Sequence, residues 1–283
     1  MPEPITSPER ARLIAPRMAL ASCVRAYLTR DTASRPLLLS QERFNHFPAS
    51  PLCSITWLIE GESFMVDAVS GRLGQKVARA LFAGPQTRPT VSYNPGPVRA
   101  IMVLFYPHAF HQLSSVDVST CVDKLVALDE VLGDDWRAMS DAVLTAPDDA
   151  ERVRHIEQFL LPRWQQVDER GNAIVNWVRR LAVQAAAAGW GRSARNLERR
   201  IRTWAGQPMR TLQRMYRAEQ SFLDARDEMI DATVSWADVA QRAGYADQAH
   251  FCRETREITG LSPTGLARAG REEESYWVYR VWS

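Results

Sequence analysis

The C-terminal half of the chain contains one short pattern twice, about 53 residues apart. In each copy an alanine is followed four residues later by a glycine, and then by two positions four residues apart that are expected to face inward (Ala187, Gly191, Leu197 and Ile201; Ala240, Gly244, Phe251 and Thr255). A small residue lets two helices approach closely, and glycine readily adopts the positive φ that a tight turn needs. The pattern therefore predicts two helix-turn-helix units, with Ser193 and Asp247 as N-caps of their second helices.

Between the two copies, residues 209–231 are predicted to form one long amphipathic helix that joins the units. The second copy, "SWADVAQRAGYADQAHFCRETREITGLSPTGL", and the first, "GRSARNLERRIRTWAGQP", resemble the AraC/XylS family of transcriptional regulators. The resemblance covers about residues 178–268 and ends in the family's Gly-x-x-Pro, here Gly260 and Pro263. The family usually has an aromatic residue where Ile201 and Thr255 stand, so we expect the second recognition helix to be packed less firmly.

The resemblance implies that the two units bind double-stranded promoter or operator DNA, with one helix of each unit in the major groove. Arginine pairs with guanine, asparagine and glutamine pair with adenine, and other arginines contact only phosphate. By resemblance, Arg195, Glu198 and Arg199 match base-contacting positions. The predicted DNA-facing residues are Arg192, Ser193, Arg195, Asn196, Glu198, Arg199 and Arg202 in the first unit, and Gln248, Ala249, His250, Cys252 and Arg253 in the second. Tyr245 and Phe251 are predicted to lie in the core.

The distribution of charge agrees with this interpretation. The chain as a whole carries only +2, but residues 173–270 contain 15 arginines and 10 acidic residues, a net charge of +5. Residues 192–217 hold eight of these arginines, and Glu198 is the one acidic residue among them. Such a local excess of positive charge attracts polyanions, although a solvated helix surface explains a charge run equally well.

The N-terminal half has a different pattern. To about residue 115, short apolar runs such as "CSITWLIEG" and "VRAIMVLFY" alternate with glycine and proline turns, which indicates a cupin-like β-barrel or sandwich. The stretches "LFAGPQTRPT" and "VLFYPHAF" carry a weaker resemblance to sensor domains of one branch of the same family. Residues 125–144 and 147–164 are predicted to be amphipathic helices that mediate homodimerisation.

The predicted fold class is therefore α+β with two domains, a β-rich N-terminal domain followed by helices and an all-α C-terminal domain. The expected boundaries are 1–165 for a sensor and dimerisation domain (β-rich to about 115, helical over 119–165), 166–172 for a linker, 173–270 for the DNA-binding domain and 271–283 for an aromatic tail. The tail, "SYWVYRVWS", alternates in a way typical of a strand. We expect it to add to the N-terminal sheet or to a partner's sheet.

A small-molecule effector is expected in the N-terminal domain, with Trp57, Phe64, Arg99 and Phe105 as candidate lining residues. No cofactor, metal or catalytic residue is predicted. His250 and Cys252 stand two positions apart on a helix, so their side chains diverge. His108 and His111 have no evident third ligand, and zinc needs three or four.

Two other functions stay open at this point: a cupin-like metal-dependent enzyme with an appended helical domain, and an interaction protein whose barrel has lost its pocket. No apolar run approaches the roughly 20 residues of a membrane span. No export signal precedes the four scattered cysteines, so we expect a cytoplasmic protein with free thiols and no membrane partner. RNA polymerase is a further expected partner.

Overall fold

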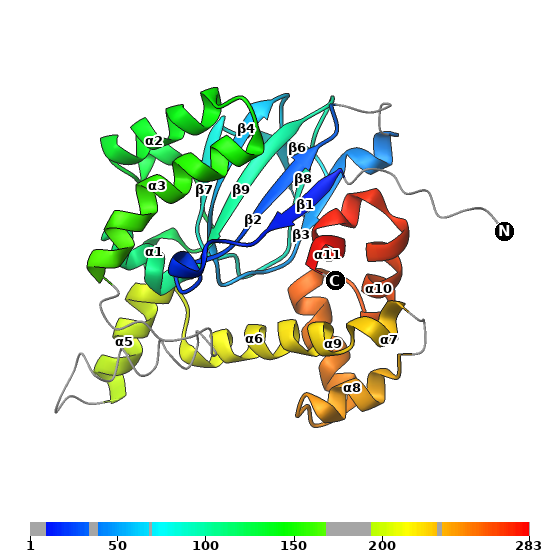
Figure 1. Ribbon diagram of the computed structural model, residues 1–283. Coiled ribbons are helices and arrows are strands. Elements are labelled where there is room, and N and C mark those ends of the chain that lie inside the picture. Colours follow the sequence, from blue (N-terminus) through cyan, green and yellow to red (C-terminus); the bar gives the residue numbers. More distant parts are fainter. Residues whose placement is uncertain (1–9, 34–38, 68–69, 168–193, 231–233, 283) are drawn as a thin grey trace.

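The computed structural model describes residues 10–33, 39–67, 70–167, 194–230 and 234–282. Two facing antiparallel sheets and a pair of helices make up the N-terminal part, and a set of shorter helices makes up the C-terminal part (Figure 1). The predicted fold class, α+β with a β-rich N-terminal domain and a helical C-terminal domain, is confirmed. No helix among the described residues is long and apolar enough to cross a membrane.

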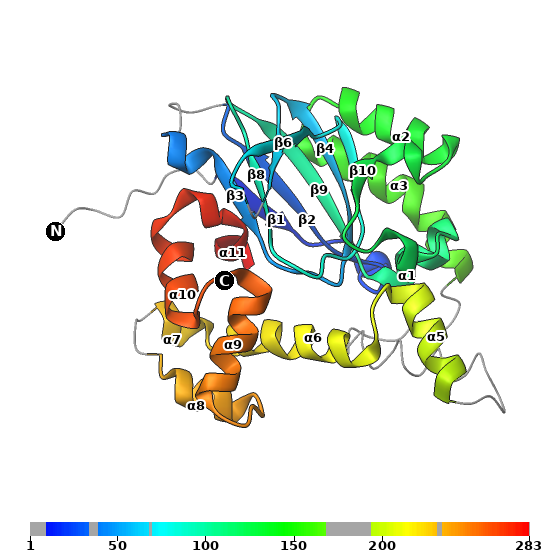
Figure 2. The ribbon, with the colours of Figure 1, turned by 180° about the vertical axis from the view of Figure 1, so that it is seen from behind.

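The larger sheet has six strands and the smaller sheet four (Figure 2). In spatial order the larger sheet contains β1 (Ala11–Ile14), β2 (Val24–Asp31), β9 (Arg99–Phe105), β4 (Cys53–Glu60), β7 (Ala80–Ala83) and β10 (Leu125–Ala127). The smaller sheet contains β3 (Phe44–Phe47), β8 (Thr90–Tyr93), β5 (Phe64–Val66) and β6 (Leu73–Lys76). Single turns of 3-10 helix, η1 (Met18–Leu20) and η2 (Ser40–Arg43), precede β2 and β3.

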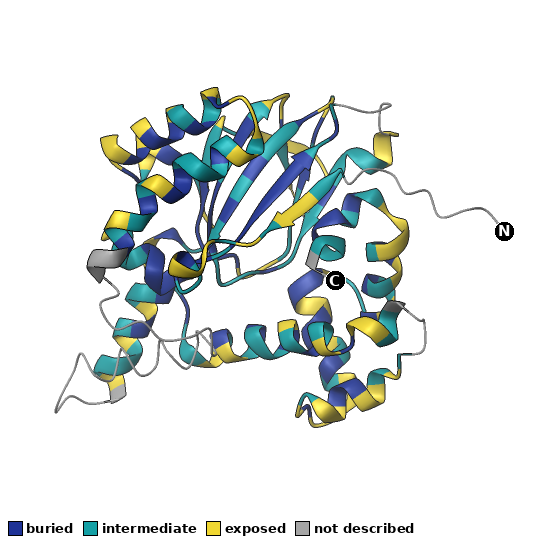
Figure 3. Ribbon diagram, viewed as in Figure 1, coloured by how far each residue is buried: buried dark blue, intermediate teal, exposed yellow. Residues whose placement is uncertain are grey.

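The two faces of the larger sheet have different environments, because side chains alternate along a strand. One face carries Cys53, Ile55 and Trp57 of β4 and packs against α2 (Asp134–Thr145) and α3 (Asp149–Val167). Figure 3 shows buried residues in dark blue on the strands and on these helices. Trp57 is completely buried, and its indole N–H donates to the Ser140 hydroxyl on α2 at 2.6 Å. The opposite face of the same strands looks toward the smaller sheet.

The segment after the sheets departs from the predicted helices. α1 (Pro107–Ser114) and the 3-10 turn η3 (Val118–Cys121) follow β9. Residues 125–144 do not form one helix: β10 comes first, then the 3-10 turn η4 (Leu128–Glu130), and α2 begins only at Asp134. Leu125 pairs with Ala83 of β7, so strand pairing outweighs the helical periodicity of this stretch. The second predicted helix is present as α3, which continues beyond Trp164 to Val167 and includes the first two residues of the expected linker.

The described C-terminal part contains α5 (Ala194–Ala205), α6 (Met209–Asp224), α7 (Arg226–Ile230), α8 (Trp236–Arg242), α9 (Gln248–Thr259), α10 (Pro263–Glu272), the 3-10 turn η5 (Glu274–Tyr276) and α11 (Trp277–Trp282). The expected long connecting helix is interrupted at Ala225, between α6 and α7. Ala187, the turn residue Gly191, the predicted DNA-facing Arg192 and the predicted N-cap Ser193 lie outside the described residues.

Candidate functional site

The second predicted unit consists of α8, a tight turn and α9. Ser235 caps α8 by accepting a hydrogen bond from the Asp238 backbone N–H at 3.4 Å. Gly244 in the turn has a φ of +73°. Asp247 caps α9, its carboxylate accepting from the backbone N–H of His250 at 2.6 Å. The predicted roles of this glycine and this aspartate are therefore present in the structure.

The surface of α9 is divided between an exposed side and a buried side. Phe251 and Thr255 are completely buried, and Tyr245 of the turn is 7% exposed. The predicted DNA-facing residues lie on the other side: Gln248, Ala249 and Arg253 are exposed, while His250 and Cys252 are half-buried. Helix α9 therefore presents these five positions to solvent and its apolar positions to the protein.

A buried carboxylate fixes α9 against α6. Glu254 is 4% exposed and accepts hydrogen bonds from the Tyr245 hydroxyl at 2.7 Å and from an Arg217 guanidinium nitrogen at 3.2 Å. The guanidinium of Arg217 also stacks 4.2 Å from the Tyr245 ring. Burial, followed by the hydrogen bond to Glu254, raises the pKa of Tyr245, so its hydroxyl remains a donor. Because the negative charge is paired and hydrogen-bonded, its burial is tolerated.

Helix α5 is the described helix of the first unit. Ile201 and Ala205 are buried, in keeping with the predicted inward face, while Leu197 is half-buried. On the opposite side Arg195, Arg199 and Arg202 are exposed and Asn196 and Glu198 are half-buried. Glu198 lies 3.5 Å from the guanidinium of Arg202, which reduces the local excess of positive charge.

Helix α5 also contacts the N-terminal part at its C-terminal end. Gly206 there has a φ of +72°, and a Cβ atom at this position would lie 2.8 Å from Val122 Cγ2. The rings of Trp204 and His111 stack with centroids 6.1 Å apart. From this end the chain enters α6, whose 16 residues span about 24 Å. Helix α6 thus separates α5 from α8 and α9 (Figure 1).

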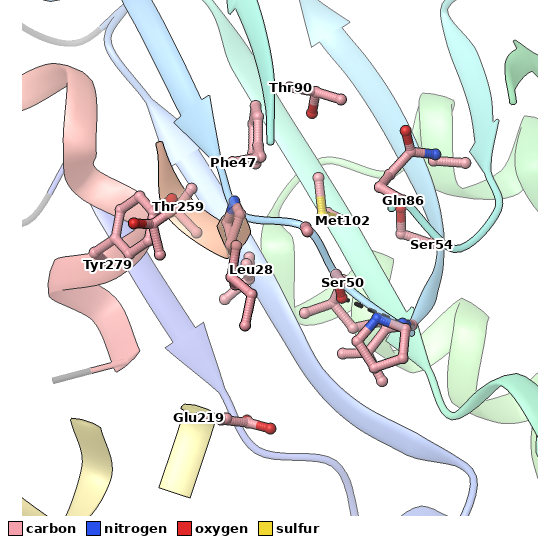
Figure 4. Close-up of a pocket in the computed structure, with 18 of the residues that line it drawn as sticks. Leu28, Phe47, Ser50, Ser54, Gln86, Thr90, Met102, Glu219, Thr259 and Tyr279 are labelled. Carbon is pink, nitrogen blue, oxygen red and sulfur yellow. Dashed lines mark hydrogen bonds between the residues drawn. The ribbon is translucent and has the colours of Figure 1, made fainter. Parts of the chain in front are cut away.

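A cavity of about 650 Å³ lies between the two sheets and extends to the C-terminal helices. In the larger sheet, the cavity is lined by residues that alternate with those facing α2 and α3, among them Leu28, Ser54 and Met102, and Thr90 lines it from the smaller sheet (Figure 4). The helical side is lined by residues of α6, α7, α9, α10 and α11, including Ile258. Most lining side chains are apolar, which is typical of sites that bind small organic molecules.

None of the four residues predicted to bind an effector lines this cavity. Trp57 and Phe105 are completely buried on the other face of the larger sheet, among the residues that pack against the helices. Phe64 alternates with Met65, and it is Met65 that lines the cavity. Arg99 instead forms ion pairs with carboxylates at neighbouring strand ends. Because successive side chains point to opposite faces of a sheet, the residues next to these predicted ones line the cavity instead.

The cavity is bordered by direct bonds between the N-terminal and C-terminal parts. The backbone N–H of Ala49 donates to the carbonyl of Ile258 near the end of α9, at 2.7 Å. Arg25 of β2 forms an ion pair with Glu219 of α6 at 3.0 Å. These contacts connect the wall of the sheets to the wall of the helices.

The aromatic tail forms a helix, and the predicted strand is wrong. It packs as η5 and α11 against β1 and β3, so the expected contact with the N-terminal sheets is present in another form. Trp277 is 4% exposed and donates its indole N–H to the Asn45 side chain at 2.8 Å. Arg30 forms a nearly buried ion pair with Glu274, and the rings of His46 and Tyr276 stack 4.3 Å apart.

No group of three or more His, Cys, Asp and Glu side chains lies together as a metal site would require, within the ranges that the structure describes. His108 and His111 are both on α1, where His111 Nδ1 lies 2.6 Å from the carbonyl of Val116.

Two family models match separate parts of the chain. Residues 170–269 match the family model described as a helix-turn-helix domain, and residues 12–127 match a model described as a domain of unknown function (DUF6597). No curated protein matches the chain.

Three similar solved structures are two of ToxT and one of CuxR. A crystal structure of ToxT from Vibrio cholerae has 10% identity and a TM-score of 0.40, covering 87% of this chain and 98% of that chain. ToxT bound to an unsaturated fatty acid has 10% identity and a TM-score of 0.34, with coverages of 82% and 94%. The AraC-like transcriptional activator CuxR has 12% identity and a TM-score of 0.27, with coverages of 96% and 98%.

The helix-turn-helix match and the geometry of α8 and α9 define a DNA-binding protein of the transcription-regulator class. More narrowly, the C-terminal region is an AraC-type helix-turn-helix domain.

Proposed function

We propose that the protein binds a specific DNA sequence through α5 and α9, and that a small, mainly apolar molecule in the cavity controls this binding. The observation that carries the proposal is that α9 has one side exposed to solvent and another side in the cavity wall. One side of this helix exposes Gln248 and Arg253, and the other side contributes Thr255 and Ile258 to the cavity wall.

In this proposal, α5 and α9 enter successive major grooves on one face of the duplex, roughly 34 Å apart. Arg195, Glu198, Arg199, Gln248 and Arg253 are the proposed base-contacting residues. The other exposed polar residues of the two helices contact phosphate, which sets position and affinity without specificity. Dimerisation through the region of α2 and α3, and contact with RNA polymerase, stay predictions.

The DNA proposal is tested by gel shift with the upstream region of the protein's own gene. A good bidentate contact contributes about 1–3 kcal/mol of discrimination. Arg199→Ala combined with Arg253→Ala should therefore abolish specific binding and leave weak, salt-dependent binding. Arg137→Ala is the control, because Arg137 lies on the surface of α2, away from α5 and α9, and its loss removes one positive charge and an exposed ion pair with Asp134. Specific binding retained by the double variant would refute the assignment of these helices.

The effector proposal follows from the contacts that border the cavity. A molecule that contacts both the sheets and the helices binds preferentially to the arrangement of the two parts in which these walls of the cavity face each other. It shifts the population toward that arrangement by its difference in affinity for the alternatives. The effector therefore acts on the placement of α9, whose end is bonded to Ala49.

Pyrene, a rigid apolar fluorophore, is a suitable probe of the cavity. Wild-type protein should bind it saturably, and Met102→Trp should abolish binding because the larger ring fills the space from β9. Met18→Trp is the matched control, since Met18 is 81% exposed and lies outside the cavity. A wild-type protein that binds no pyrene, or a Met102→Trp variant that binds it as well as wild type, would contradict the proposal.

A further inference from the structure

The inner side of α9 gives the cavity a polar end. Thr255, Ile258 and Thr259 of this helix all line the cavity, and Tyr279 of α11 lines it from the neighbouring helix. Figure 4 shows Thr259 and Tyr279 together on the helical side of the pocket. The inference developed from this end of the cavity rests on the proposed function, because it concerns the ligand of the same site.

Two hydroxyl groups at this end lack hydrogen-bond partners. Thr255 Oγ1 and Tyr279 Oη are buried, and neither has a partner among the described residues. Thr259 differs, because its hydroxyl donates to the carbonyl of Thr255 at 2.8 Å. Buried polar groups in folded proteins are nearly always paired, so two unpaired hydroxyls on one cavity indicate a missing acceptor. A threonine in a helix has two favourable rotamers, so Oγ1 can turn toward an occupant.

Two of the four arginines that line the cavity form ion pairs with carboxylates. Arg25 pairs with Glu219, and Arg280 pairs with Glu274. Arg271 donates to the carbonyl of Met229 at 3.2 Å. Arg226 is exposed to solvent at the rim. Arg226 and Arg271 are both exposed, so their charges are hydrated, and an ionised ligand head buried at Thr255 would lose its hydration without gaining a buried opposite charge, which is unfavourable.

We infer that the cavity binds a neutral, mainly apolar molecule with one hydrogen-bond acceptor, such as a ketone, and that the hydroxyls of Thr255 and Tyr279 donate to this acceptor. The apolar body occupies the space between the sheets, and the acceptor lies against α9. The ligand thus contacts the second recognition helix directly, on the side opposite to Gln248 and Arg253.

Three pyrene derivatives test this inference by fluorescence titration of the full-length protein. Pyrene has no acceptor, 1-acetylpyrene has a neutral carbonyl, and 1-pyrenecarboxylate has a charged head. Wild-type protein should bind 1-acetylpyrene about three- to tenfold more tightly than pyrene, as one or two net hydrogen bonds allow. It should bind the carboxylate most weakly.

Thr255→Val and Tyr279→Phe remove only the two hydroxyls. Each should weaken 1-acetylpyrene binding about threefold or more and leave pyrene binding unchanged, because the apolar contacts remain. Tyr27→Phe removes a buried tyrosine hydroxyl outside the cavity and should leave both affinities unchanged. If the two residues were merely structural, their variants would change stability without changing the preference for the carbonyl.

The outcomes separate the inference from the proposed function on which it rests. Equal binding of pyrene and 1-acetylpyrene by wild type and variants would overturn the polar end while supporting the cavity as a ligand site. Tightest binding of 1-pyrenecarboxylate would overturn the neutral class of ligand. Failure of all three probes to bind would overturn both the inference and the proposed effector site.

Discussion

Replacing Trp277 by alanine should release the tail from the N-terminal sheets. Trp277 is 4% exposed, donates to Asn45 at 2.8 Å, packs edge-on against Phe47 and lies 5.2 Å from the guanidinium carbon of Arg30. Truncating a buried tryptophan to alanine costs about 3–5 kcal/mol. The measured decrease in the free energy of unfolding cannot exceed the free energy with which the tail is docked on the sheets. If the substitution costs more than this, the tail undocks while the sheets stay folded.

Urea unfolding followed by tryptophan fluorescence measures the loss, and hydrogen exchange locates it. Amides of β3 and α11 should exchange faster in Trp277→Ala, whereas amides of β9 should not. Trp277→Phe keeps most of the packing but leaves the Asn45 side-chain oxygen without its donor, so we expect a loss of about 1–2 kcal/mol. Leu39→Ala, at an exposed site, should change stability by less than about 0.5 kcal/mol.

The graded series makes the prediction refutable. If the free energies of unfolding of Trp277→Ala and Trp277→Phe both lie within about 0.5 kcal/mol of the wild-type value, and hydrogen exchange in β3 is unchanged, then the tail does not stabilise the contact between the N-terminal and C-terminal parts.

Three further predictions concern the same contact and the turn before α9. Glu274→Gln should cost about 3 kcal/mol because it leaves the charge of Arg30 buried and unpaired, while Arg30→Met combined with Glu274→Leu should cost less; urea midpoints decide. Gly244→Ala should cost about 1–2 kcal/mol from its φ of +73° alone, since nothing lies within 4 Å of the added Cβ, and Gly133→Ala, equally unobstructed but with a negative φ, serves as control. Burial lowers the pKa of His46 from its usual 6.5, so its contribution to stability is complete above that pH and is lost as pH falls below it; the drop in the urea midpoint on acidification should shrink in His46→Phe.

The local features of the second unit were predictable from the sequence, because their causes are local. Gly244 adopts a positive φ, Asp247 caps the next helix, and Phe251 faces inward, each for a reason contained within a few residues. The separation of a β-rich half from a helical half followed from the change in hydrophobic period. The buried charge network around Glu254 was missed, since nothing in sequence spacing shows that Arg217 lies within reach.

Three features depended on tertiary context. Both faces of β4 are rich in apolar or small residues, so the sequence does not tell which face meets helices and which meets the cavity. This is why Trp57 was predicted for the wrong environment. The tail is too short for its hydrophobic pattern to distinguish the period of 2 of a strand from the period of 3.6 of a helix. Trp277, Val278 and Val281 lie on one side of the observed helix, although alternate residues of the same tail would also lie on one side of a strand. Residues 125–127 became a strand only because β7 offered an edge.

The two proposed recognition helices, α5 and α9, contact the same N-terminal part at different places. The end of α5 packs at Gly206 against Val122, whereas α9 is bonded to Ala49 and is followed by a tail that packs on β1 and β3. The described cavity lining includes residues of α9, α10 and α11 but none of α5. In the proposed function, a ligand in this cavity acts on one unit and leaves the anchor of the other in place. Its effect is on the relation between α5 and α9, so binding to DNA that carries both half-sites should respond to the ligand more strongly than binding to either half-site alone.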